Sequence, residues 1–409
     1  IVMAKQGAAE LSAPTPVPST KPPIIFVEHF EQSGPWTQPT YLITGFRREL
    51  IASLVHFREW IIYDGDEGGR AKADYIVSAG YFDDGSEARV TVLLKDRTTG
   101  QCIVSETMEL DFITWGEMLQ RIVHKTALSL NLHLTRRRLS GPAVDEAGNF
   151  DAYDLWLKAN EIRTVWRKDT YVKAEALLNE VVAKAPEYAP ALSALAGLLN
   201  TRHLSEIGVR RSPERARRAR ELARRSVAID PLDGRNHHAL AWANAMDGAY
   251  GQAELHFELS VDLNPTSPRT LMPCAQGLSF LGNDAEALRL TEKALDIHPT
   301  MIARHWGYVQ SIYYLAGDIA KSLEAADVAG GAILDLQAWH AAALARAGAY
   351  DQAQAKMQAF LENARAVWSG EKSPSDEQIA AWLVHAFPIR RAKDAAYLRE
   401  GFALAGLPV

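Results

Sequence analysis

Three arginines recur at similar intervals in the second half of the chain and could together bind an acidic group. Arg235, Arg269 and Arg304 each fall early in a stretch whose apolar residues have helical spacing. An arginine near a helix N-terminus opposes the helix dipole at a cost of about 0.3–1 kcal/mol, so its repeated use there indicates another purpose. A guanidinium can donate paired hydrogen bonds to carboxylates and phosphates. The alternative is that these arginines pair with acidic residues of neighbouring helices.

Six further residues are expected on the same helices, beside the arginines. Aromatic residues and arginine are typical of binding surfaces, because they combine large contact area with directed hydrogen bonds. The sequence therefore predicts a peptide or ligand seat formed by Arg235, His238, Trp242, Arg269, Met272, Gln276, Phe280, Arg304 and Tyr314.

The chain contains no spacing typical of a catalytic or metal-binding motif, such as a phosphate-binding loop, a zinc-type cysteine pair or His-Glu-x-x-His. The glycine-rich stretch 64–69 lacks the calcium-loop spacing, so it predicts a plain turn. Two distant cysteines, Cys102 and Cys274, favour a reducing compartment, and we expect a cytoplasmic location. We expect no catalytic residue, no metal and no cofactor.

Composition limits the possible partners. Of 409 residues, 47% are hydrophobic and 23% are charged, which is typical of globular domains. The net charge of -6 disfavours a general nucleic-acid coating role, so contact with nucleic acid is expected only through another domain. No run approaches the roughly 18 apolar residues that a membrane span needs.

The first part of the chain reads as a proline-rich linker, residues 1–23, followed by a small α/β domain, residues 24–140. The chain begins with Ile1 rather than Met, so we expect a domain upstream of the linker. Short apolar runs predict strands and longer periodic runs predict helices. The expected strands are 24–27, 60–63, one from 75, 89–94 and 102–108, and the expected helices are 41–57 and 115–132. Turns are expected at 83–85 and 98–100.

Residues 141–150 read as a second linker, and beyond them the pattern is helical. Pro186, Pro231, Pro265 and Pro299 each follow a helical stretch, and the last two steps are each 34 residues long. The first step is 45 residues, which is one unit and an 11-residue insertion near 201–212. A 34-residue period is typical of a repeat built from two helices.

The repeat resembles the tetratricopeptide family, whose second helix carries a small residue, a bulky one, another small one and then proline. The matching positions in the clearest unit are Ala253, Phe257, Ser260 and Pro265. The resemblance implies about six repeats over residues 151–373 and a C-terminal helical cap over 374–409. The fold class is therefore α+β, with a small sheet domain before an all-α solenoid. In such a solenoid the first helix of each unit lines an inner groove, which is where the nine predicted site residues would lie.

The α/β segment also resembles a bacterial domain similar to the amino-terminal domain of the Tol-Pal translocation protein B. The resemblance rests on the stretches 23–27, 73–77 and 93–96, the helix expected at 115–132 and the segment 151–157. In similar proteins this tandem lies behind a winged-helix DNA-binding domain or a class III adenylyl or guanylyl cyclase domain. The resemblance implies a regulatory arm.

Three functions stay open on the sequence. The first is the sensory, protein-interaction arm of a bacterial transcriptional regulator, which binds a protein, a peptide or a small-molecule effector in the groove. The second is the regulatory arm of a nucleotide cyclase. The third is a stand-alone scaffold or adaptor. A homodimer is compatible with each of them.

Overall fold

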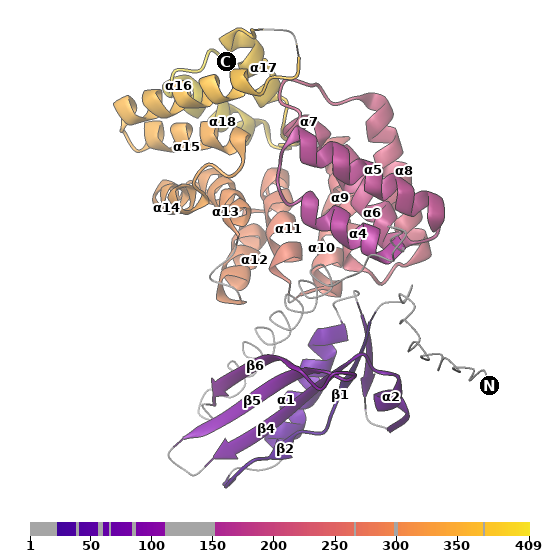
Figure 1. The fold of residues 1–409 in the computed structure, drawn as a ribbon. Helices are drawn as coiled ribbons and strands as arrows, with labels where there is room; N and C mark the ends of the chain where they lie inside the picture. Colours follow the sequence, from indigo (N-terminus) through magenta and orange to yellow (C-terminus); the bar gives the residue numbers. More distant parts are fainter. Residues whose placement is uncertain are drawn as a thin grey trace, which may run out of the picture.

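A computed structural model describes residues 23–37, 41–55, 60–64, 67–83, 87–110, 152–265, 267–297, 302–370 and 373–409. A mixed sheet comes first in the chain, and a long series of helices follows it in a curved array (Figure 1). The predicted α+β fold class is confirmed.

The sheet has six strands in the order β3-β1-β4-β5-β6, and β2 pairs with β4 outside that path. Strands β1, β2 and β3 run parallel to their neighbours, whereas β4, β5 and β6 are antiparallel to one another. The strands span Ile24–Val27 (β1), Glu31–Gln32 (β2), Ile61–Asp64 (β3), Tyr75–Asp83 (β4), Ala88–Asp96 (β5) and Cys102–Glu109 (β6).

Alternation along the strands explains how the sheet buries one face. Val90, Val92 and Leu94 of β5 are buried while the residues between them are more exposed. They share a core with Phe46 and Leu50 of α1 (Tyr41–Val55), whose apolar residues recur at helical spacing. The sheet therefore packs its apolar face under a helix, as layered α/β folds do.

The strands predicted at 24–27, 60–63, 89–94 and 102–108, the strand from 75 and the helix from 41 are all present, with ends shifted by a few residues. One prediction is wrong: the stretch expected to be a plain turn contains the start of helix α2 (Glu67–Lys72). Helix α2 has only six residues, which fits the short link between the end of β3 at Asp64 and the start of β4 at Tyr75. The helix expected at 115–132 and the linker at 141–150 lie outside the described residues.

Six helix pairs follow in the described part of the chain, and each first helix packs against its second. The pairs are α4 (Ala152–Ile162) with α5 (Lys168–Lys184), α6 (Ala189–Asn200) with α8 (Pro213–Ile229), α9 (Gly234–Met246) with α10 (Tyr250–Leu263), α11 (Pro268–Leu281) with α12 (Asp284–Ile297), α13 (Ala303–Leu315) with α14 (Ile319–Ala329), and α15 (Leu334–Arg346) with α16 (Tyr350–Ala366). Three further helices of the described residues complete the array, namely α7 (Arg202–Ser205), α17 (Asp376–Val384) and α18 (Ala392–Leu404).

The repeat signals in the sequence correspond to physical features of these pairs. Helices α5, α8, α10 and α12 each end two residues before a repeat proline, because proline disfavours a helical residue before it. The turn glycines at 248, 282, 317 and 348 have φ between 77° and 87°, a conformation that glycine adopts without strain. Ala253, Phe257 and Ser260 are fully buried at the interface of the repeat.

The two ends of the helical array are joined. The insertion after α6 contains α7, and its residues lie against a segment more than 160 positions later in the chain. The backbone nitrogen of Ser369 donates to the carbonyl oxygen of Ile207 at 2.8 Å, and His203 Nε2 lies 3.1 Å from the carbonyl oxygen of Ala386. Gly208 has φ +86°, and a Cβ there would lie 2.3 Å from the Trp368 ring. The insertion therefore makes an internal contact of the helical array.

The C-terminal segment between α17 and α18 also crosses to the middle of the array. The backbone nitrogen of Arg390 donates to the carbonyl oxygen of Phe280 at 2.9 Å, and the Arg391 guanidinium bonds Gly282 and Asp284. Phe387 packs against Phe280 and Trp339. The segment therefore covers part of the concave face. None of the described helices is long and apolar enough to cross a membrane.

Candidate functional site: a cationic cavity in the helical array

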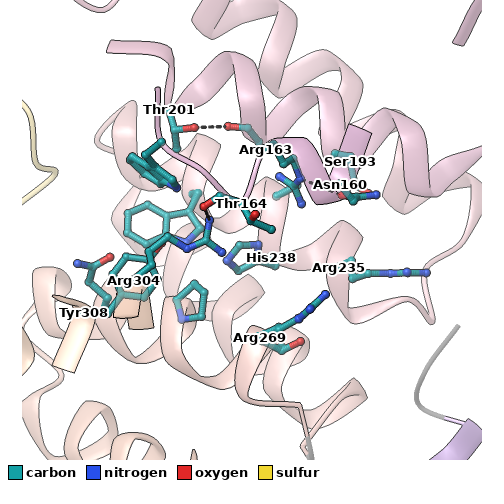
Figure 2. Close-up of a pocket in the computed structure, with 18 of the residues that line it drawn as sticks. Asn160, Arg163, Thr164, Ser193, Thr201, Arg235, His238, Arg269, Arg304 and Tyr308 are labelled. Carbon is teal, nitrogen blue, oxygen red and sulfur yellow. Dashed lines mark hydrogen bonds between the residues drawn. The ribbon is translucent and has the colours of Figure 1, made fainter. Parts of the chain in front are cut away.

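The concave face encloses a cavity of about 300 Å³. Each of the first helices α4, α6, α9, α11, α13 and α15 contributes residues to its wall, and Phe387 contributes from the C-terminal segment. Figure 2 labels ten polar and charged side chains of the wall: Asn160, Arg163, Thr164, Ser193, Thr201, Arg235, His238, Arg269, Arg304 and Tyr308. The repeat geometry thus brings residues from across the array to one space.

Seven of the nine predicted site residues line this cavity. They are Arg235, His238, Trp242, Arg269, Gln276, Phe280 and Arg304. The prediction is wrong for Met272 and Tyr314, which are fully buried in the core. Tyr314 packs against Trp339, and its hydroxyl accepts a hydrogen bond from Arg346 Nε at 3.2 Å.

Arg235 is the arginine whose charge is already matched. Its guanidinium pairs with Asp233 at 2.6 Å and lies over the Trp156 ring, 5.3 Å from the ring centroid. Asp233 is also the N-cap of α9, where it accepts from the backbone nitrogen of Arg235. The acidic partner of Arg235 thus belongs to its own helix and not to a neighbouring helix, as the alternative expectation had it.

Arg163, Arg269 and Arg304 differ from Arg235, because none of them has a carboxylate within ion-pair distance among the described residues. Arg163 Nε donates to Asn160 Oδ1 at 2.8 Å, and Arg304 Nη1 donates to the carbonyl oxygen of Thr164 at 3.4 Å. Figure 2 shows Arg163 and Arg304 gathered with His238 around one part of the cavity, while Arg235 and Arg269 reach away from them.

The pKa values reflect this unbalanced positive charge. Burial, with smaller contributions from repulsion by Arg304 and Arg269, lowers the pKa of Arg163 to about 10. Burial, with repulsion from Arg163 and Arg304, lowers the pKa of His238 to about 4. Near neutral pH Arg163 is therefore charged and the imidazole of His238 is neutral.

The acidic residues among the described wall of the cavity are Glu161, which is exposed, and Asp335, which is buried. Burial raises the pKa of Asp335 to about 7, so this carboxyl is only partly ionised at neutral pH. Burial also raises the pKa of Tyr308, which stays a neutral donor. The cavity accordingly has a net positive charge under physiological conditions.

Sequence reasoning missed Arg163, Tyr308 and Phe387. Tyr308 follows Arg304 by four positions on one helix, so the helical spacing rule could have found it. Arg163 directly follows α4, and its place depends on how the first pair ends. Phe387 reaches the cavity from the segment after α17, which carries no repeat signal.

The described residues contain no group of three histidine, cysteine, aspartate or glutamate side chains that could hold a metal ion. Cys274 is fully buried, and burial raises the pKa of its thiol to about 12, which makes it a poor nucleophile. The arrangement in the cavity is suited to binding an acidic group, since most of its charged groups are guanidiniums, which donate hydrogen bonds and stay protonated near neutral pH.

The sequence matches no protein-family model and no curated protein. Among solved structures it is similar to a thermophilic tetratricopeptide-repeat protein of Thermus thermophilus, TTC0263, at 17% identity and a TM-score of 0.38, over 47% of this chain and 98% of that chain. A tetratricopeptide-repeat protein of Parabacteroides merdae is similar at 12% identity and a TM-score of 0.38, over 67% and 95%. YrrB, described as a tetratricopeptide-repeat protein with an unusual peptide-binding site, is similar at 16% identity and a TM-score of 0.28, over 44% and 86%.

These likenesses concern the fold. The paired helices of the described residues resemble a tetratricopeptide-repeat solenoid, and a small mixed sheet precedes them.

Proposed function

We propose that the chain is a binding module whose ligand or partner occupies the cavity of the repeat array. The observation that carries this proposal is the cavity itself, to which all six first helices contribute and in which three arginines lack an acidic partner among the described residues. Arg163 and Arg304 are partly buried and Arg269 is exposed. Positive charge that is partly removed from water and has no counter-charge is costly, so the protein gains when a negatively charged group binds beside it.

We further propose that this module is the sensory arm of a bacterial transcriptional regulator and acts in the cytoplasm on an upstream winged-helix domain. The order of a small mixed sheet followed by tetratricopeptide repeats supports it, as does the resemblance of the sheet segment to the Tol-Pal translocation protein B domain. The arm of a class III cyclase and a stand-alone scaffold are the competing functions.

The reading frame upstream of the codon for Ile1 separates these functions. A winged-helix domain there supports the regulator, and a cyclase domain with paired metal-binding aspartates supports the second function. An initiator codon immediately upstream supports the scaffold. Tight, sequence-specific DNA binding by residues 1–409 alone, seen in a gel shift, would contradict the regulator, in which DNA contact belongs to the upstream domain.

The binding role itself can be tested by filling the cavity. Gly197 lies on α6 in the cavity wall, and a Cβ there would have Arg163 Nη1 as its nearest neighbour, at 3.8 Å. Gly197→Leu therefore places a side chain in the cavity without a backbone clash. Gly251→Leu is the matched control, because Gly251 lies on α10 with nothing within 4 Å of its added Cβ.

Two measurements find the binders: thermal-shift screening of metabolites, and capture of protein partners from a bacterial lysate. The effect of the two glycine variants on binding should be the same in both measurements. We expect a ligand or partner that binds the unaltered chain and the Gly251→Leu variant to lose its effect with Gly197→Leu. If every binder is retained by the Gly197→Leu variant, the cavity is not the binding site.

A further inference from the structure

The cavity has features that define the chemistry of its occupant more closely. We infer that it binds a small organic dianion, whose charged oxygens lie between Arg163 and Arg304 and whose apolar body lies against the aromatic side chains of the wall. This inference rests on the proposed function and names the ligand class for that same cavity.

The charge of the occupant follows from the two guanidiniums. Arg163 and Arg304 lie close enough to lower the pKa of the same imidazole, that of His238, and each keeps donors that no described residue accepts from. One carboxylate would balance one of them, whereas a phosphate monoester carries about two negative charges at neutral pH. A dicarboxylate carries the same charge, so the shared chemistry is a dianion with acceptor oxygens.

Two polar atoms beside these arginines are left without a partner. Arg304 Nε and His238 Nε2 are both inaccessible to solvent, and neither has a hydrogen-bond partner among the described residues. A buried polar group that makes no hydrogen bond costs about 1–3 kcal/mol, so such groups usually have a reason. An oxyanion in the cavity would accept from the Arg304 Nε–H.

Hydroxyl groups complete the polar side of the cavity. Thr201, Ser193 and Tyr308 all line it. Burial raises the pKa of Tyr308, so its hydroxyl remains a donor. Tyr308 can therefore donate to an acceptor oxygen of an anion, whereas Ser193 and Thr201 already donate to the carbonyl oxygens of Pro190 and Gly197.

The volume of the cavity and its aromatic side chains indicate the size and the apolar character of the ligand. The cavity of about 300 Å³ is within the range of small-molecule sites and is too small for a folded partner. Its remaining wall includes Trp166, Trp242, Phe280 and Phe387. The C-terminal segment that carries Phe387 covers the concave face, so a long peptide could not lie along the whole groove.

The test uses the full chain and four probes that separate charge from aromatic body. Isothermal titration is carried out with phenyl phosphate, phthalate, inorganic phosphate and phenol. We expect phenyl phosphate or phthalate, which combine a dianion with a ring, to bind at least about tenfold more tightly than phenol. Inorganic phosphate should bind more weakly than phenyl phosphate because it lacks the ring. The stronger of the two aromatic dianions identifies the source as a phosphate ester or a dicarboxylate.

Arg163→Gln and Arg304→Gln should each weaken the tighter probe by at least about tenfold, since each removes a charged donor. Arg289→Gln is the matched control, because Arg289 lies on α12 outside the cavity wall and pairs with Glu286 on the same helix. Affinity for the anions that equals the affinity for phenol would overturn the inference. Equal affinity in all three arginine variants would overturn it too.

A second measurement keeps the inference testable if an arginine variant does not fold. In the unaltered chain, raising NaCl from about 0.05 M to about 0.5 M should weaken the binding of phenyl phosphate and leave phenol unchanged, because salt screens charge. Binding that is insensitive to salt contradicts a site held by charge.

The failure of this inference differs from failure of the proposed function. If only neutral ligands bind and Gly197→Leu abolishes their binding, the cavity is a site but the occupant is not an anion. If the anions bind but Gly197→Leu has no effect on them, the anions bind elsewhere, and the inference is wrong.

Discussion

Trp382 Nε1 donates a hydrogen bond of 3.1 Å to the carbonyl oxygen of His203, although the two residues are 179 positions apart in the sequence. Both residues are buried. The contact joins α17, near the end of the chain, to the insertion after α6. Repeat arrays normally make contacts only between neighbours. This contact is therefore a departure from a purely linear stack, and it lies next to Phe387, the residue of the C-terminal segment that lines the cavity.

The C-terminal closure should be measurable through Arg391, which bonds the carbonyl oxygen of Gly282 at 2.9 Å and pairs with Asp284 at 2.7 Å. We expect Arg391→Gln to lower the free energy of unfolding by about 1–2 kcal/mol, because it removes charge-assisted bonds that are partly exposed. Urea denaturation measures the loss, and amide exchange should locate it in residues 376–404. Arg399→Gln, an exposed position on α18, is the control and should change stability by less than about 0.5 kcal/mol.

Two glycines on first helices should respond to alanine in opposite directions. A Cβ at Gly277 would lie 2.2 Å from the Phe257 ring, which is itself fully buried, so Gly277→Ala should destabilise the fold by about 1–3 kcal/mol. Gly197 has room for a Cβ, so Gly197→Ala should stabilise it by about 0.5–1 kcal/mol. Thermal denaturation measures the midpoint temperature of each variant. A change of this temperature in the same direction in both variants would contradict the packing described for α11.

Asp335 should make stability depend on pH near neutrality. Burial raises the pKa of this carboxyl to about 7, above its value of about 3.9 in an unfolded chain. The folded state binds the Asp335 proton more tightly than the unfolded state does. The contribution of this proton to the free energy of unfolding is therefore fully present below about pH 4 and is lost as the pH rises through about 7. Asp335→Asn should remove this loss. Between pH 5 and pH 8 the free energy of unfolding of the variant should therefore rise relative to that of the unaltered chain, by about 1–4 kcal/mol. Parallel stability curves over that range would contradict the burial of an ionisable Asp335.

His238 should titrate far below an ordinary histidine. Burial and the charges of Arg163 and Arg304 lower the pKa of its imidazole to about 4, so stability tied to the neutral ring is present above about pH 6.5 and is lost as pH falls toward 4. Proton NMR of the ring measures this pKa directly. Arg304→Gln should raise it because a repelling charge is removed, whereas Arg289→Gln should not change it. An imidazole that titrates near 6.5 would contradict the cationic environment.

Much of this fold could be predicted because proline and glycine mark every repeat. Once the period is known, the first helix of each pair is known, and the residues that face inward follow from a rotation of about 100° per residue. Arg269, Gln276 and Phe280 lie on one stripe of α11 for this reason. Met272 is rotated by about 60° from Arg269, and Tyr314 by about 80° from Arg304, so both turn into the core.

The rest of the site could not be predicted from the period, because it comes from places where the period is interrupted. Arg163 comes after α4, before the first repeat proline, and Phe387 comes from a link between two helices that follow the last pair. The contact of α7 with residues 368–386 depends on the curvature of the whole array, which is the sum of small rotations between pairs. No local sequence pattern encodes that sum.

The joining of residues 203–208 to residues 368–386 has a consequence for how the array loses its structure. A linear stack of repeats frays from its ends, since a terminal unit has a neighbour on one side only. Here α15, α16 and α17 are fastened back to the second pair, so unfolding from the C-terminal end must first break contacts with a unit near the beginning. The helix pairs that lie between residues 203–208 and residues 368–386 in the sequence should therefore unfold as one cooperative block.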